Sequence, residues 1–196
     1  MTARAMPAKS ELRREVRARI AALPAGVRSE RDQSLVERLL AIAGLDNGPF
    51  FAYAALADEV CLDMFVQTVV ARGGVVALPR IGPDGSMAAH RIRSLADDWV
   101  PGPLGIREPK ADLPVVAPEA LSVVLVPGRA FDVRGGRVGR GAGYYDRYLA
   151  QTGARRIGIA YEEQVFAEVP MDARDVRMHR IVTPERVIEC VETEQA

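Results

Sequence analysis

VLVPGRAFDVRGGRVGRGAGYYDRYL, residues 124–149, is the stretch that decides the fold and points to the function. The β-branched run at residues 122–126, which leads into this stretch, predicts a buried strand that ends at Pro127 and Gly128. A segment rich in glycine and arginine follows, and helical spacing resumes at residues 144–146. The predicted order is therefore strand, glycine- and arginine-rich loop, helix.

The loop has the composition of an anion-binding segment. Residues 128–143 hold six glycines and four arginines. Glycine lets backbone N–H groups approach an anion in conformations that other residues avoid, and a helix N-terminus adds partial positive charge. Arginine supplies planar, bidentate donors for phosphate oxygens. A cradle for nucleotide phosphates is one interpretation, and a glycine-rich hairpin that only turns the chain is the other. The tyrosines and the acid at the helix start favour the cradle.

Two common phosphate-binding motifs are excluded by the letters of the loop. A Walker loop ends in Gly-Lys-Ser/Thr, and residues 124–149 contain no lysine. The dinucleotide motif G-x-G-x-x-G also fails, because the sixth position is Tyr144 when counted from Gly139 and Asp146 when counted from Gly141.

The overall composition is that of an ordinary globular domain, so we expect one domain over residues 1–196. Hydrophobic residues make up 48% of the chain and charged residues 27%. The formal net charge of +0 gives no global field for nucleic acid or an anionic membrane, so we expect neither as a partner. Arginine and tyrosine in the loop could also contact RNA, but no basic stripe flanks them.

Cysteine content and the N-terminal sequence indicate a cytoplasmic protein, which we expect to be a monomer. Cys61 and Cys190 are the only cysteines, and they have neither C-x-x-C nor metal-site spacing. The first twenty residues lack the apolar core of a secretion signal, and no apolar run reaches the length of a membrane span.

Alternating strands and helices predict an α/β fold, a single-domain Rossmann-like open sheet with helices on both faces. We expect helices at residues 9–23, 29–43 and about 61–72, and strands at residues 50–54, 75–78, 87–92, 156–161 and, as an edge pair, 180–188. Residues 94–118 are rich in proline and glycine and predict a long ordered loop. Trp99 within it could stack on a ligand, but we favour packing against the loop.

Two positions outside the loop are candidates for ligand binding. Lys9 and Arg13 lie four apart on a helix, so they share one face; on spacing alone this is a solvated basic edge. Glu59 lies in a strand-to-helix connection, where open α/β sheets bind ligands. A carboxylate that interacts with the helix dipole is the alternative for Glu59.

Motifs in four separated places together resemble the 5-formyltetrahydrofolate cyclo-ligase family, also called methenyltetrahydrofolate synthetase. They are KSELR at residues 9–13, LGIREP at 104–109, Pro127-Gly128 with Phe131-Asp132, and RVGRGAGYYD at 137–146. The resemblance extends over about residues 9–188. It implies that ATP reacts with 5-formyltetrahydrofolate to give 5,10-methenyltetrahydrofolate, ADP and phosphate. The folate substrate can be the simple or the polyglutamylated form.

The resemblance also implies roles for individual residues. Catalysis is assigned to Arg137, Arg140 and Tyr144. Binding of the co-substrate ATP is assigned to Lys9, Ser10, Glu11, Leu12, Arg13, Arg137, Val138, Gly139, Arg140, Gly141, Ala142, Gly143, Tyr144 and Tyr145. Binding of the folate substrate is assigned to Tyr53, Ala54, Glu59, Arg140, Gly141, Ala142, Gly143 and Tyr144. The Mg²⁺ ligands are Asp146 and Asp175.

Two residues depart from the family pattern. Arg174 stands where many bacterial members have histidine. Beside Asp175 it could pair with that carboxylate and compete with the metal, and the sequence leaves its effect open. Ala142 stands where glycine or lysine is common. A non-catalytic folate-binding or buffering protein, or a divergent member with another substrate, is the alternative function. The intact set of Lys9, Arg13, Arg137 and Asp146 argues against a pure binder, which has no need of the ATP half of the site.

Overall fold

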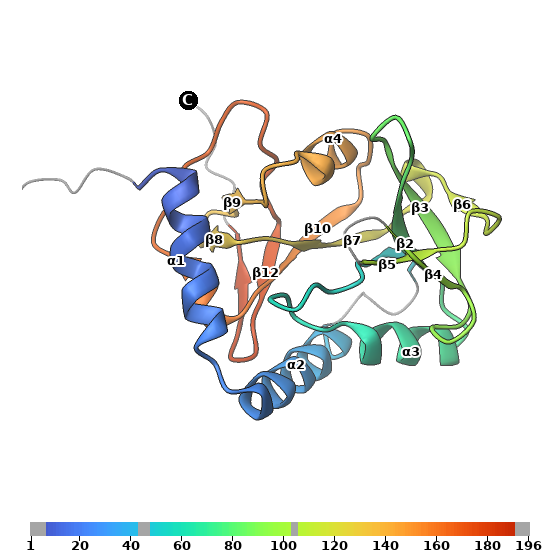
Figure 1. The fold of residues 1–196 in the computed structure, drawn as a ribbon, viewed down its shortest axis with the longest axis horizontal. Coiled ribbons are helices and arrows are strands. Elements are labelled where there is room, and N and C mark those ends of the chain that lie inside the picture. The colour runs from blue at the N-terminus through green and yellow to red at the C-terminus, as the bar shows by residue number, and fades with distance from the viewer. Residues whose placement is uncertain (1–6, 43–47, 103–105, 191–196) are drawn as a thin grey trace, which may run out of the picture.

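The computed structural model describes residues 7–42, 48–102 and 106–190, and a mixed eight-stranded sheet forms its centre (Figure 1). The strand order is β13-β12-β10-β7-β1-β2-β3-β6. The bounds of these strands are β1 Phe50–Phe51, β2 Val76–Ile81, β3 Met87–Ile92, β6 Val115–Val116, β7 Val123–Pro127, β10 Arg155–Ile159, β12 Arg180–Val182 and β13 Val187–Glu189. The helices are α1 Lys9–Ala21, α2 Ala25–Leu40, α3 Asp63–Ala71 and the short α4 Tyr144–Leu149.

The strand order reverses beside β1, and this reversal positions the site. The chain passes from β1 to its parallel neighbour β2 on one side, and later continues from β7, on the other side of β1, to β10 and β12. Open α/β sheets bind ligands at such a switch point, beyond the carboxyl ends of the strands. The edge strand β13 runs antiparallel to β12, which confirms the edge pair predicted within residues 180–188.

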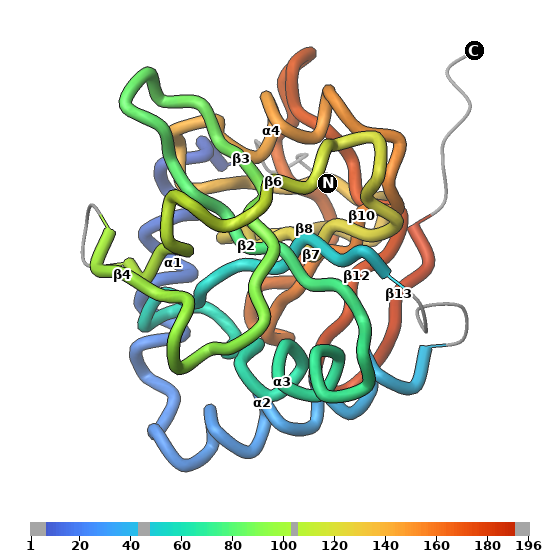
Figure 2. Tube along the Cα trace, turned by 90° about the vertical axis from the view of Figure 1, so that its right-hand side faces the viewer, coloured from blue at the N-terminus to red at the C-terminus, as the bar shows by residue number. Residues whose placement is uncertain are grey.

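Both faces of the sheet are covered by helices, as Figures 1 and 2 show. Side chains alternate across a strand, so Phe50 and Phe51 of β1 enter opposite cores. The core around Phe50 includes buried residues of α1, α2 and α3, whereas the core around Phe51 includes Tyr148 and Leu149 of α4. The predicted fold class, an open α/β sheet with helices on both faces, is confirmed.

The first two helices are close to prediction, with one shifted start. Leu12, Val16 and Ile20 form the buried stripe of α1. The second helix begins at Ala25 rather than residue 29, because Pro24 fixes the backbone ahead of it and its carbonyl accepts the first helical hydrogen bond. The predicted end of this helix at residue 43 lies outside the described residues.

The segment predicted to be a long ordered loop contains strands. Within residues 94–118, β4 Trp99–Pro101 pairs with β5 Arg107–Pro109, and β6 pairs with β3. Trp99 packs partly buried against the core, and the Arg107 guanidinium lies 4.9 Å from its ring centroid, which supports packing rather than ligand stacking. These pairings join only two or three residues of each strand, so the sequence has no period that would reveal them.

The first half of the glycine- and arginine-rich segment is a hairpin. β8 Ala130–Asp132 pairs antiparallel with β9 Arg137–Val138, and β11 Val165–Phe166 extends this small sheet. The buried Asp132 carboxylate accepts the N–H groups of Arg134 and Gly136 and closes the turn. The hairpin interpretation therefore holds for residues 130–138, and residues 139–143 form the loop that precedes α4.

Two strand boundaries differ from prediction. The first strand ends at Phe51 instead of residue 54, and β2 continues through Pro79 to Ile81. Pro79 lies beyond the last pair of β2 with β1, Phe51 with Ala77, where the parallel ladder no longer needs a donor.

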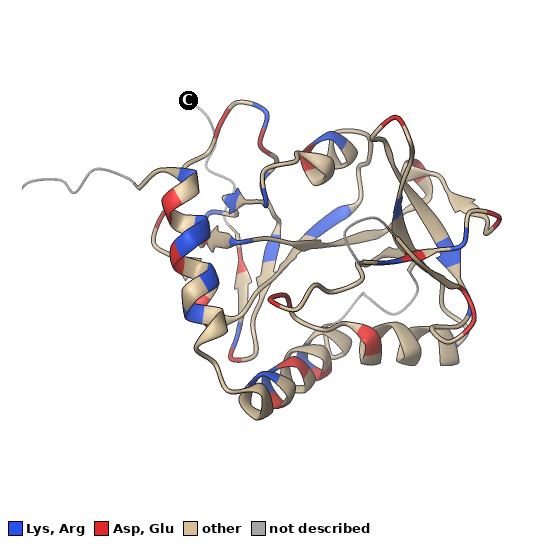
Figure 3. Cartoon of the chain, in the orientation of Figure 1, with Lys and Arg blue, Asp and Glu red and all other residues tan. Residues whose placement is uncertain are grey.

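Acidic and basic residues are interspersed along α1 and α2 (Figure 3), and none of the described helices is long and apolar enough to cross a membrane.

Candidate active site

A cleft with a volume of about 620 Å³ lies beyond the carboxyl ends of β1, β2 and β7. Its walls come from the segment after β1, the end of β2, the start of α1, the loop at residues 139–143, and α4. Most of the predicted site residues line it: Lys9, Arg13, Tyr53, Ala54, Glu59, Arg137, Gly139, Arg140, Gly141, Ala142, Gly143, Tyr144, Tyr145, Asp146 and Asp175. The structure thus brings together residues from the two ends of the sequence.

Four residues assigned to ATP binding do not line the cleft. Leu12 and Val138 are buried in the core. Ser10 is exposed, and the Glu11 carboxylate accepts the N–H of Ala8 at 3.2 Å at the start of α1. The helical period explains the split, because only residues four apart in α1, Lys9 and Arg13, share the face that meets the cleft.

Arg13 joins α1 to the loop at residues 139–143. Its Nε donates to the Gly139 carbonyl oxygen at 2.8 Å. Gly141 has φ +112° and Gly143, directly before α4, has φ +70°, and side chains larger than glycine rarely adopt these conformations. Glycine is therefore required for the path that carries the loop along the cleft wall to α4.

Arg137 lies at the base of this loop in a nearly buried position. One Nη donates to Asp146 Oδ1 at 2.7 Å, and the other donates to the Pro127 carbonyl at 3.2 Å. Its Nε, also buried, has no hydrogen-bond partner within the described ranges. A buried donor without a partner is costly, so a ligand oxygen at this position would be stabilised.

Lys9 is paired with two carboxylates of the cleft wall, those of Asp172 and Asp175. Its ammonium contacts Asp172 at 2.6 Å and also Asp175. Burial alone would raise the pKa of Asp175, but the hydrogen bonds from Lys9 and from the Asp172 backbone outweigh it and hold that pKa below its usual value. Lys9, and not Arg174, is therefore the partner of Asp175, although Arg174 also lines the cleft.

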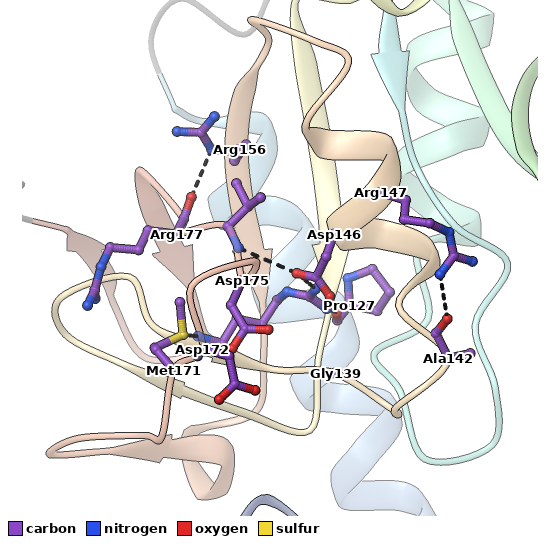
Figure 4. A network of polar contacts seen from close by, with 12 residues as sticks. Pro127, Gly139, Ala142, Asp146, Arg147, Arg156, Met171, Asp172, Asp175 and Arg177 are labelled. Carbon is purple, nitrogen blue, oxygen red and sulfur yellow. Dashed lines mark hydrogen bonds and ion pairs between the residues drawn. The ribbon is translucent and has the colours of Figure 1, made fainter.

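The two predicted metal ligands lie on adjacent segments. Asp146 Oδ1 is 3.5 Å from the backbone nitrogen of Val176, the residue after Asp175, and both carboxylates line the cleft (Figure 4). No group of three or more His, Cys, Asp or Glu side chains with metal-binding geometry occurs among the described residues. Mg²⁺ commonly takes one or two carboxylates and completes its shell with water and phosphate oxygens, so this pair fits it chemically.

Arg140 connects the loop to the segment after β1. Its Nε donates to Glu59 Oε1 at 2.8 Å, and its Nη2 pairs with Asp58. Asp58 also pairs with Arg129. Burial raises the pKa of Asp58, but hydrogen bonds from Arg129 and Arg140 outweigh this and leave that pKa below its usual value. Asp58 is therefore ionised at neutral pH.

The far end of the cleft is apolar and was not predicted from the sequence. Leu56, Pro79, Ile81, Met87 and Ile106 line it. Ile81 and Met87 are paired across the antiparallel β2–β3 hairpin, so their side chains lie on the same face of the sheet. This pairing is the signal in the sequence that could have placed them together. The nearly buried Glu108 adds a carboxylate there, 3.5 Å from Arg80.

Three tyrosines occupy the junction between the two ends. Tyr53 donates to the Val60 carbonyl at 3.0 Å, and burial raises its pKa. Burial also raises the pKa of Tyr145, whose hydroxyl has no partner within the part of the chain described. The Tyr144 ring lies 5.2 Å from the Arg147 guanidinium, which donates to the Ala142 carbonyl at 2.9 Å (Figure 4). The phenols of Tyr53 and Tyr145 therefore remain neutral at physiological pH.

A profile of the 5-formyltetrahydrofolate cyclo-ligase family matches residues 5–184. The chain belongs to this family. A cyclo-ligase of Mycolicibacterium smegmatis is 30% identical over 188 residues, which are 92% of this chain and 95% of that protein. The mouse cyclo-ligase is 25% identical over 193 residues, with 89% and 93% covered.

Solved structures of cyclo-ligases agree with the fold. The 5,10-methenyltetrahydrofolate synthetase of Aquifex aeolicus superimposes with a TM-score of 0.85 at 29% identity, over 96% of this chain and 95% of that one. The Mycoplasma pneumoniae synthetase, at 23% identity and a TM-score of 0.73, supports the fold alone.

Membership of the cyclo-ligase family confirms the prediction of an enzyme of this class. The family and its relatives indicate 5-formyltetrahydrofolate cyclo-ligase activity, which uses ATP as co-substrate. The roles of individual cleft residues and of Mg²⁺ stay predictions.

Proposed function

We propose that this protein converts 5-formyltetrahydrofolate to 5,10-methenyltetrahydrofolate in an ATP-dependent reaction that releases ADP and phosphate. The observation that carries this proposal is the convergence of Lys9 and Arg13 from α1 with Arg137 and Arg140 on the glycine loop of one cleft. A protein that only bound folate would have no use for this cationic half.

The chemical problem is that a formamide oxygen is a poor leaving group. Transfer of the γ-phosphoryl group from ATP to the formyl oxygen forms a new P–O bond, breaks the bond between the β- and γ-phosphates and releases ADP. The formyl oxygen is then part of a phosphate leaving group. N10 then attacks the formyl carbon, the C–O bond breaks, phosphate departs and N10 loses its proton. Phosphoryl transfer requires mainly alignment and charge neutralisation, which cations in a cleft can provide.

The cationic end of the cleft would bind the triphosphate. Lys9 would exchange its carboxylate partners for phosphate oxygens, and Arg13 would hold the loop amides in place around them. Asp146 and Asp175 would hold Mg²⁺, which neutralises charge on the phosphates. The unpartnered Nε of Arg137 would then find an acceptor.

The apolar end would bind the reduced pterin. A flat heterocycle can be enclosed by Ile81, Met87 and Ile106, while its ring N–H and amino groups need acceptors. Glu59 borders both ends and would accept such donors. The formyl group would then lie between the phosphates and the pterin, beside Arg140 and Tyr144.

The test is the near-ultraviolet absorbance of purified protein with 5-formyltetrahydrofolate, with and without magnesium and ATP. The methenyl product is conjugated and the substrate is not, so we expect a rise that needs both ATP and magnesium. Absence of a rise in a folded sample that binds both ligands would overturn the proposal. Binding of folate alone would leave the folate-binding or buffering protein as the better account.

A further inference from the structure

Asp58 joins two arginines from different segments, and of these two only Arg140 lines the cleft. Arg129 follows β7 and Arg140 belongs to the glycine loop, and each pairs with a different oxygen of the Asp58 carboxylate. The Arg129 side chain is only 11% exposed. Asp58 is absent from the cleft lining, so it acts from behind the surface that a ligand would touch.

Arg140 has two acidic partners in this structure, and they differ in their access to the cleft. Glu59, which lines the cleft, takes Nε at 2.8 Å, and Asp58 takes Nη2 from behind. These contacts leave Nη1 unused by either carboxylate. If Glu59 turns to the substrate, Asp58 is the partner that still fixes the plane of the guanidinium.

We propose that Asp58 is a positioning residue that holds the Arg140 guanidinium at the reaction centre while Glu59 exchanges Arg140 for the folate. This inference rests on the function proposed above. A planar guanidinium whose Nη2 is held by the Asp58 carboxylate presents Nη1 in a restricted range of directions. Once Glu59 has turned to the folate, loss of the Asp58 contact leaves the Arg140 guanidinium free to rotate away from the developing charge.

The first test compares two variants of this cluster. Asp58→Asn keeps the shape of the side chain but removes its charge, and we expect kcat to fall about tenfold, with KM for ATP and folate changed less than about twofold. Asp58→Glu restores the charge on a longer stem, and we expect a smaller fall. Asp58→Asn with kcat within twofold of wild type would overturn the proposal.

The matched control is Arg129→Met. It breaks the buried pair with Asp58 but leaves the contact between Asp58 and Arg140 in place. A purely structural role for Asp58 predicts equal losses of kcat in Asp58→Asn and Arg129→Met, and that result would contradict positioning. We expect Arg129→Met to lower the melting temperature while kcat stays within about twofold of wild type.

A double variant separates action through Arg140 from independent action. In an Arg140→Ala background there is no guanidinium to position, so adding Asp58→Asn should cost no further activity. A further tenfold loss would overturn the proposal. Failure of the proposed function can be distinguished from failure of this inference. If the proposed function is wrong, the wild type itself gives no ATP-dependent absorbance rise. If the wild type turns over normally and Asp58→Asn does too, only the role of Asp58 is rejected.

Discussion

The two ends of the cleft are built by different means. At the α1 end, charged side chains neutralise one another: Lys9 pairs with Asp172 and Asp175, and Arg137 pairs with Asp146. At the β2–β3 end the wall is aliphatic, with Ile81 and Met87 paired across the hairpin. Glu59 and Arg140 lie where the two ends meet.

This difference teaches that the cleft is prepared for two unlike ligands. Ion pairs can exchange partners with a metal-bound polyanion at little net change in charge, whereas an aliphatic wall gains from covering a flat heterocycle. We therefore interpret the α1 end as the ATP half and the β2–β3 end as the folate half. Each prediction below perturbs one half and measures whether the other responds.

The largest effect is expected at Arg137, which links the loop to α4. Arg137→Ala should lower kcat by at least about 100-fold, because it removes a preorganised positive charge from the phosphate end. Arg137→Lys, which keeps the charge but not the two-armed contact with Asp146 and Pro127, should be impaired less. Wild-type turnover in folded Arg137→Ala, with folding checked by circular dichroism, would break the assignment of this end.

A smaller and selective effect is expected at Glu59. Glu59→Ala should raise KM for 5-formyltetrahydrofolate about tenfold and KM for ATP less than twofold, because the lost acceptor belongs to the folate half. Glu59→Gln keeps an oxygen acceptor for the Leu56 N–H, now 3.0 Å away, and serves as control. If KM for ATP rose more than KM for folate, Glu59 would belong to the other half.

Loop geometry supplies the third prediction. Gly141→Ala places a side chain at φ +112°, which costs about 1–2 kcal/mol in backbone strain and should weaken ATP binding several-fold. The matched control is Gly153→Ala, where φ is outside the left-handed region and nothing lies within 4 Å of the added Cβ. Calorimetric titration of a non-hydrolysable ATP analogue checks both. Equal binding by wild type and Gly141→Ala would mean that the loop path does not matter.

The smallest effect is the pH dependence of the Lys9–Asp175 pair. The folded-state pKa of Asp175 lies below its ordinary value of 3.8, so its contribution to stability is present above that value and lost as the pH falls through the folded pKa. We expect Asp175→Asn to lower the free energy of unfolding by under about 1 kcal/mol at pH 7. Urea melts should show this difference shrinking as the pH falls below 3.8. A difference that stays constant as the pH falls through that range would contradict the assignment.

The residues of the α1 end could be predicted because each of the two segments that supply them is a compact motif. Residues 137–146 form one contiguous motif, and the spacing of Lys9 and Arg13 on a helix announces a shared face. The same reasoning failed for Leu12 and Val138, which have the motif's letters but face the core. A motif names positions, whereas the period of the element decides which side chains reach the ligand.

The folate half could not be predicted in the same way. Leu56, Ile81 and Ile106 come from three segments and share no motif. Their meeting depends on how the strands are ordered in the sheet, and the contact of Asp58 with Arg129 joins residues 71 positions apart. Alternating strands and helices predicted the α/β sheet, but the hairpin at residues 130–138 depended on a buried carboxylate, Asp132, accepting backbone donors.

The most direct test of the division of the cleft is a crossed binding measurement by calorimetry on Lys9→Ala and Ile81→Ala. The two ligands, titrated separately, are a non-hydrolysable ATP analogue with magnesium and 5-formyltetrahydrofolate. We predict that Lys9→Ala weakens the nucleotide about tenfold and the folate less than twofold, and that Ile81→Ala weakens the folate about threefold or more and spares the nucleotide. Equal weakening of both ligands by both variants would contradict the account.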